Sequence, residues 1–224
     1  MNAPQLDAND VARYLKDHPH FFEQFSELLE QIQIPSPHEG RAVSIPERQM
    51  GAMRDKIRQM EAKLAEMIAF GEENDSISTK VHRLGVALQG VGDLTEAMRV
   101  LYAHLGGDFS VPHVAVRLWG VGGGEAVEFT PVTDSLKAAA GAMDEPYCGT
   151  ATEQEAVAWL GDAGEQVRSV AQIPLREGAG EDGACFGLLL LASEEVHRFY
   201  PDMGRLYLQR IGDMAAAALL RVVD

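Results

Sequence analysis

Between Met50 and Met67, the apolar residues of the chain recur at alternating steps of three and four positions. This spacing places them on one narrow stripe of a helix, which is typical of the a and d positions of a coiled coil. A helix that packs on its own domain usually has a broader apolar face. We therefore predict a dimeric coiled coil, with an intramolecular helix as the alternative. The predicted dimerisation residues, here called the seam, are Met50, Met53, Ile57, Met60, Leu64 and Met67.

The charged residues beside the seam indicate how two copies would pair. With Met50 at position a, Lys56 falls at g and Glu61 falls at e. In a parallel coiled coil the g residue of one helix faces the next e residue of the other, so the pattern favours a parallel pair. An exposed ion pair contributes only about 0.2–1 kcal/mol, so the seam must supply most of the association. Beyond Gly71 the apolar register changes, which predicts that one helix ends near Gly71 and a second helix begins there.

The chain before the seam shows helical spacing of apolar residues, followed by a proline-containing connector. Two short helices fit the first segment, with Pro19 in the first turn of the second helix, where its missing N–H costs nothing. Pro35 and Pro37 then end the pair, because a residue that precedes proline avoids helical geometry. We therefore divide the chain into a helical pair with its connector (1–40), a coiled-coil linker helix (41–72) and a third region (73–224).

The third region alternates between strand-like and helical patterns. Alternating or continuous apolar runs predict strands at 113–120, 125–131, 167–175 and 184–193. Helical patterns lie before, between and after these runs, and the last one follows Pro201. An antiparallel sheet flanked by helices results, which makes the predicted fold class α+β.

Several sequence stretches resemble one known family. They are HPHFF at 18–22, GRAVSIPERQ at 40–49, END at 73–75, Cys148–Gly149, VRSVAQIPL at 167–175 and FYPDMGRLYLQRIG at 199–212. Together they resemble the DUF484 family of bacterial proteins over nearly the whole chain. The resemblance implies a GAF-like domain at 73–224, but no activity that transfers to individual residues. Family members are often encoded beside a tyrosine recombinase, an association that points to chromosome maintenance without showing it.

The composition of the chain indicates which partners and which cellular compartment to expect. The net charge is −15, from 34 acidic and 19 basic residues, which disfavours nucleic-acid binding because phosphate contacts need a basic surface. Cys148 and Cys185 are too few and too far apart for a disulfide framework or a zinc site. The N-terminus lacks a signal-peptide pattern, and the run Leu188–Ala192 is far too short to span a membrane. We expect a cytoplasmic protein without membrane contact.

Four residues are candidates for ligand binding, because GAF-like domains usually hold ligands between the sheet and the small helices. Arg117 shares a strand face with Ala115 and Trp119, and could bind a carboxylate or phosphate; the alternative is an edge arginine paired with a carboxylate. Cys148 could bind a ligand or sense oxidation if its pKa were lowered, and otherwise is a buried thiol. Gly149 and Ser169 complete the candidate set.

No pattern in the sequence indicates catalysis, a cofactor or a metal. His18 and His20 are two positions apart, so on a helix they would point in different directions, and GVGGG at 120–124 precedes a strand-like run instead of a helix. We predict a non-enzymatic regulatory homodimer that binds an unidentified small molecule or protein. One alternative is an adaptor that works through an exposed Phe21 or Phe22. A less favoured one is a redox enzyme that uses Cys148.

Overall fold

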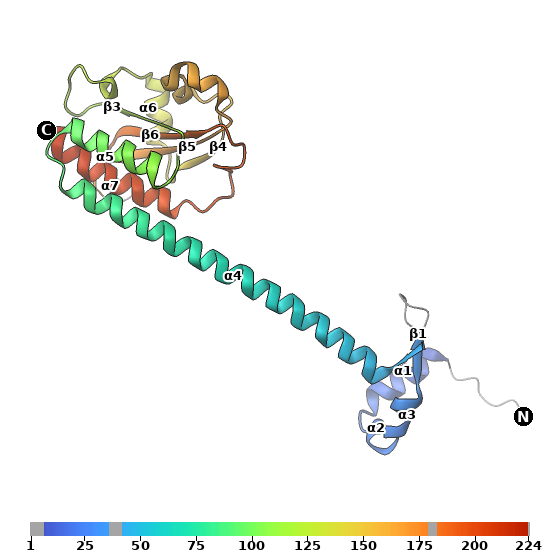
Figure 1. Cartoon of the computed structure of the whole chain (residues 1–224). Helices are drawn as coiled ribbons and strands as arrows, with labels where there is room; N and C mark the ends of the chain where they lie inside the picture. Colours follow the sequence, from blue (N-terminus) through green and yellow to red (C-terminus); the bar gives the residue numbers. More distant parts are fainter. Residues whose placement is uncertain (1–6, 36–41, 179–182, 224) are drawn as a thin grey trace, which may run out of the picture. The chain divides into compact units, whose positions relative to one another are not determined.

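The computed structural model describes residues 7–35, 42–178 and 183–223, and it divides into two compact units (Figure 1). The first unit is Met1–Gly71 and the second is Glu72–Asp224. One long helix, α4, contributes its N-terminal part to the first unit and its C-terminal part to the second. None of the helices in the described part of the chain is long and apolar enough to cross a membrane.

The first unit begins with three short helices instead of the predicted two. They are α1 (Ala8–Asp17), α2 (Phe21–Gln24) and α3 (Ser26–Gln31). The second predicted helix is divided because Phe25 leaves helical geometry, with φ −125° and ψ 47°. The connector also contains an antiparallel strand pair that the sequence pattern did not predict, β1 (Gln33–Pro35) and β2 (Ala42–Ser44).

Helix α4 (Ile45–Gln89) is continuous over 45 residues, so the predicted boundary between two helices near Gly71 is wrong. A glycine inside a helix costs roughly 0.5–1 kcal/mol relative to alanine, which weakens a helix of this length without ending it. The change in apolar register has a different cause. The side chains of Val81, Leu84 and Leu88 are buried in the core of the second unit, whereas the seam residues are exposed.

The second unit contains a four-stranded antiparallel sheet with the strand order β3-β6-β5-β4. Its strands are β3 (His113–Leu118), β4 (Tyr147–Thr150), β5 (Ser169–Arg176) and β6 (Cys185–Ser193). The predicted strand at 125–131 is wrong, because that segment holds a short 3-10 helix, η1 (Val127–Phe129). Its burial is the reverse of the expected alternation, since Val127 is exposed and Glu128 is buried. Strand β4, which the pattern missed, takes the fourth place.

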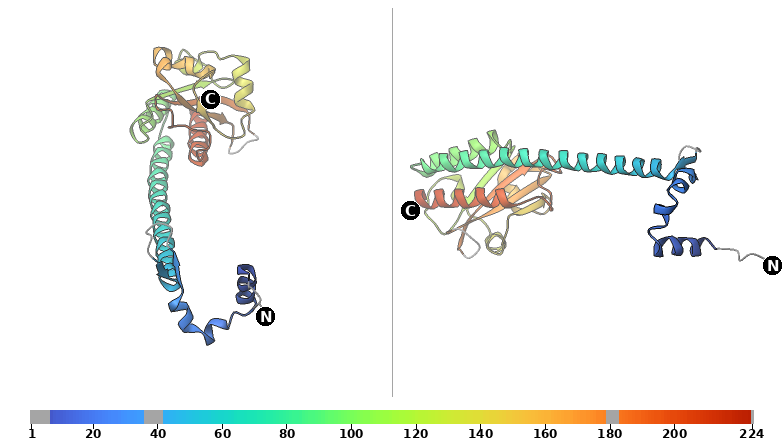
Figure 2. Two further views of the ribbon diagram at one scale, coloured as in Figure 1. Left: turned by 90° about the vertical axis from the view of Figure 1, so that its right-hand side faces the viewer. Right: turned by 90° about the horizontal axis from the view of Figure 1, so that it is seen from below.

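Helices cover both faces of this sheet, each over its own apolar core. The C-terminal part of α4 lies on one face together with α5 (Leu94–Gly107) and α7 (Leu206–Val223), and α7 runs beside α4 (Figure 2). The other face is covered by α6 (Asp134–Gly141) and a 3-10 segment, η2 (Glu155–Gln166). Helices packed around an antiparallel sheet confirm the predicted α+β class.

Candidate functional site

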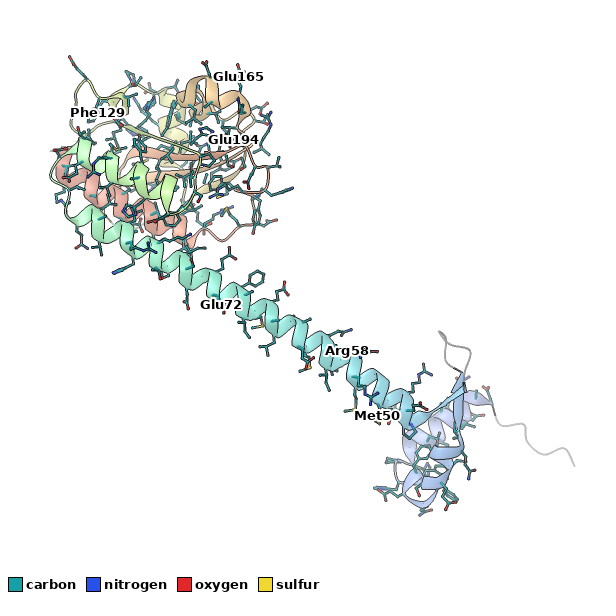
Figure 3. All side chains as sticks on the ribbon, in the orientation of Figure 1. Met50, Arg58, Glu72, Phe129, Glu165 and Glu194 are labelled. Atoms are coloured by element: carbon teal, nitrogen blue, oxygen red, sulfur yellow. The ribbon has the colours of Figure 1, made fainter. Side chains whose placement is uncertain are left out.

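The seam forms an exposed apolar row on the N-terminal half of α4. Each of its six side chains is between 52 and 66% exposed, although each is a large apolar group. The side chains along this part of α4, where Met50 and Arg58 are labelled, project outward from the helix (Figure 3). Ile68 and Phe70 extend the exposed apolar surface at the C-terminal end of the row. Contiguous exposed apolar surface of this kind marks an interaction site.

The charged residues that flank the seam are free to pair with another molecule. Lys56 and Glu61 are both exposed, and neither forms an ion pair with any other described residue. Arg58 and Asp55, which lie away from the seam at positions b and f, instead pair with each other at 3.5 Å. The e and g positions beside the seam therefore present three exposed cations, Arg54, Lys56 and Lys63, and one exposed carboxylate, Glu61, none of them in an ion pair with another described residue.

The N-terminal helices hold a small cluster of aromatic rings. Tyr14 stacks on His18 at 4.2 Å between ring centroids, and Phe21 stacks on Phe25 at 4.8 Å. Phe21 and Phe22, which the adaptor hypothesis requires to be exposed, are half-buried, whereas Tyr14 and Phe25 are exposed. No group of three or more metal-ligating side chains occurs among the described residues.

Arg117 lies on β3, an outer strand of the sheet, and its Nε is buried without a hydrogen-bond partner among the described residues. Its Nη1 donates a hydrogen bond of 2.9 Å to the Val116 carbonyl, and its guanidinium lies 5.2 Å from the ring centroid of Trp159. Its side chain is buried, and it forms no ion pair with any carboxylate in the described part of the chain. Because β3 is an outer strand, this contact satisfies a carbonyl that has no neighbouring strand.

A hydrogen-bonded pair of the half-buried Tyr102 and the buried Glu128 lies near the same edge, and sequence reasoning missed it. The Tyr102 hydroxyl donates to Glu128 Oε1 at 3.3 Å. Burial, followed by the negative charge of Glu128, raises the pKa of Tyr102 to about 12. The neutral phenol is therefore a stable hydrogen-bond donor that holds η1 against α5. The one available signal was the acidic Glu128 inside an otherwise apolar strand-like run.

The other three candidate residues do not lie beside Arg117. Cys148 is on β4, at the opposite edge of the sheet from β3, and it is buried in the core under α7. The Ser169 hydroxyl donates to the Glu195 carbonyl at 2.6 Å, so it anchors the loop after β6. A Cβ on Gly149 would lie 2.5 Å from the Tyr147 hydroxyl oxygen, which accounts for the glycine there. The structure therefore brings Cys148, Gly149 and Ser169 onto the paired strands β4 and β5, and leaves Arg117 on the other outer strand.

The environment of Cys148 makes it an unreactive thiol. Burial raises the pKa of Cys148 to about 11, and Arg205 lowers it only in part. At neutral pH the thiolate fraction should be about a hundredfold lower than in an unperturbed thiol, because two pKa units separate them. We expect iodoacetamide to alkylate Cys148 more slowly than free cysteine at pH 7, and at the free-cysteine rate in denaturant. Mass spectrometry of the labelled peptide measures both rates, and faster labelling in the folded protein would contradict the assignment.

The face where a GAF-like ligand pocket was expected is occupied by packed side chains. Small and branched apolar residues of α6, η2 and the sheet form a second buried core there. Polar groups on this face bond to one another: Gln172 donates to Gln154 Oε1 at 2.6 Å, and Gln154 donates to the Tyr147 hydroxyl at 3.4 Å. In the region where the pocket was expected, apolar side chains therefore pack together and these polar side chains bond to one another.

A cavity of about 440 Å³ lies on the opposite side of the second unit, among α4, α5, α7 and the segment that joins β6 to α7. Leu105, Val111, Leu191 and Ile211 form its buried floor. None of the four ligand-binding candidates from the sequence lines it. Its lining comes from segments more than a hundred residues apart in the chain, so no local motif could have indicated it.

Comparison with known families gives a match that spans the whole chain. The family model described as "Protein of unknown function, DUF484" matches residues 1–224. The chain belongs to the DUF484 family. It is also similar to a protein of Salmonella typhimurium (strain LT2), the uncharacterized protein YigA, with 26% identity over 225 residues that cover 97% of this chain and 92% of YigA.

The DUF484 match extends over the whole length that contains the stretches from HPHFF to FYPDMGRLYLQRIG. The match spans the first unit, the seam and the second unit alike. The match to the family model therefore covers the seam and the second unit together. YigA is matched over nearly its full length as well.

Proposed function

We propose that this DUF484 protein is a non-enzymatic regulatory module that dimerises through a parallel coiled coil of α4. The observation that carries the proposal is the row of six large apolar seam side chains that are exposed on one narrow stripe of α4. A second copy of the chain offers the same narrow stripe, and pairing would remove both stripes from water. Fully burying a leucine, isoleucine or methionine stabilises by about 1.5–3 kcal/mol, so twelve such side chains are a substantial driving force.

The charges beside the seam support the parallel orientation over the antiparallel one. In a parallel pair, Lys56 at g faces Glu61 at e of the other helix, and this attraction occurs twice. In an antiparallel pair the g positions face each other, which would place Lys56 opposite Lys63 twice. The attraction between Arg54 and Glu61, both at e, would offset that repulsion in part. The parallel arrangement has the attractive pairs without the repulsive ones.

The proposed role of the second unit is binding without catalysis. The thiol that a redox mechanism would use, Cys148, is buried and has a raised pKa, so it is poorly suited to act as a nucleophile. The coiled coil would hold two copies of this unit in one complex. Because α4 continues into the core of the second unit without a break, a change at either end of the helix can reach the other end.

A charge exchange tests both the dimer and its orientation. We expect light scattering at micromolar concentration to give twice the mass of the chain. Lys56→Glu should weaken the dimer several-fold, because it replaces two attractions by two repulsions worth about 0.2–1 kcal/mol each. Lys56→Glu combined with Glu61→Lys should restore wild-type affinity at low salt. A monomeric wild-type protein would overturn the dimer, and a double variant as weak as Lys56→Glu would overturn the parallel register.

A further inference from the structure

The cavity of about 440 Å³ in the second unit combines an apolar interior with free charges at its rim. Its walls include the rings of Phe109, Phe199 and Tyr207, with Met203 at the side. Cavities of roughly 300–1,000 Å³ with mainly apolar walls and a few polar groups are typical of small-molecule sites. The volume suits a compact organic molecule, and the walls favour an apolar body.

Arg198 is the polar group best placed to orient a ligand in this cavity. It lies half-buried on the segment between β6 and α7, where one Nη donates to the Phe109 carbonyl and the guanidinium lies 5.8 Å from the Phe199 ring centroid. Its Nε is buried and has no hydrogen-bond partner among the described residues. A guanidinium with free donors is suited to a planar carboxylate, which can accept two hydrogen bonds at once.

The charges at the rim limit how many negative groups a ligand can carry. Lys80 on α4 adds a second cation, while Glu73 and Glu195 add two carboxylates. None of these four charged groups forms an ion pair within the part of the chain that the structure describes. The balance of charge favours one negative group placed at Arg198, because a polyanion would meet Glu73 or Glu195.

We infer that this cavity binds an apolar molecule that carries a single carboxylate, with the carboxylate on Arg198 and the apolar body among Phe109, Phe199 and Met203. The inference rests on the proposed binding role of the second unit, but not on dimerisation. The site also includes Ile77 and Lys80 of α4, so its occupant would contact the same helix that carries the seam.

Methyl NMR of methionine-labelled protein tests this site with decanoate as the probe. The chain has nine methionines, and Met203 lines the cavity whereas Met50, Met53, Met60 and Met67 lie on the seam. We expect decanoate to shift the Met203 methyl signal saturably while the seam methyl signals stay in place. Decanol, which has the same chain without the charge, should bind about tenfold more weakly or worse, because it lacks the charged hydrogen bond. Equal affinity for both probes, or shifts confined to the seam, would overturn the inference.

Two variants of the full chain test the site from different sides. Arg198→Met should remove the preference for decanoate over decanol. Gly204→Phe should block both probes by filling the cavity, and the backbone can accept it because nothing lies within 4 Å of a Cβ placed there. Arg205→Gln is the matched control, since Arg205 bonds to Glu145 and does not line this cavity. Decanoate affinity that is unchanged in Arg198→Met, or unchanged in Gly204→Phe, would overturn the inference.

The test of the cavity site can fail or succeed independently of the test of the proposed dimer. Light scattering of the same samples reports the mass of the complex, and methyl shifts at Met203 that Gly204→Phe abolishes report the cavity, because Gly204 lines this cavity and not the neighbouring pocket that Met203 also lines. A monomer that binds decanoate at Met203 would contradict the dimer and retain the cavity site. A dimer whose Met203 signal does not shift with decanoate would retain the dimer and contradict the cavity site.

Discussion

Replacing both Ile57 and Leu64 by lysine is expected to convert the dimer into a monomer. Both residues occupy position a of the seam, so a parallel dimer of this variant would place four lysines in its apolar interior. Burying an unpaired charge costs several kcal/mol, and the lost isoleucine and leucine contacts add to that cost. We expect the dissociation constant to rise by more than about a hundredfold. Sedimentation velocity over a series of micromolar concentrations measures the change.

The matched control places the same two charges on the opposite side of the helix. Ala62 and Ala69 fall at position f and are exposed, so Ala62→Lys combined with Ala69→Lys adds two lysines without touching the seam. This variant should dimerise almost as the wild type does, apart from a small effect of net charge. If the control dissociated as fully as the seam variant, the association would depend on total charge and the coiled-coil assignment would fail.

The sequence predicted those elements whose pattern follows from their own local geometry. Strands β5 and β6 were found because long apolar runs such as Leu188–Ala192 suit strands that are buried on both faces. The strand β3 was found from its alternating β-branched residues, and the final helix α7 from the helical spacing of apolar residues after Pro201. The seam was visible because apolar residues at two positions in every seven form a narrower stripe than most helices of a single globular domain present.

Elements were misjudged where tertiary contacts outweigh local pattern. The run at 125–131 alternates like a strand, but the hydrogen bond from Tyr102 holds Glu128 inward and the segment forms η1 instead. Strand β4 is short and contains Gly149, so little in its sequence separates it from a loop. Gly71 looked like a helix boundary, yet α4 continues through it to Gln89.

The candidate ligand site was the part least accessible to sequence reasoning. Alternation correctly placed Arg117 on the sheet face that also carries Ala115, but it could not show that the guanidinium lies against Trp159 and donates to the Val116 carbonyl. Arg117 and Cys148 lie on the two outer strands, a separation that depends on the strand order. The cavity beside Arg198 depends on four segments that meet only in the folded chain.

One substitution made at two positions of α4 should separate folding from association. Leu84→Ala is expected to lower the free energy of unfolding of the second unit by about 2–5 kcal/mol, because Leu84 is completely buried and its truncation leaves a cavity. Leu64→Ala is the matched control, since Leu64 is 58% exposed on the same helix. Leucine and alanine are both good helix formers, so a difference between the two variants reflects burial and not helix propensity.

Tryptophan fluorescence during urea unfolding measures this difference directly. Both tryptophans of the chain, Trp119 and Trp159, lie in the second unit, so their signal follows that unit alone. Any loss in Leu64→Ala that arises through a weaker dimer should depend on protein concentration, because association stabilises by mass action. The loss in Leu84→Ala should be the same at all concentrations. Equal and concentration-independent losses in both variants would mean that Leu64 is packed within its own chain, which would leave the seam without its proposed role.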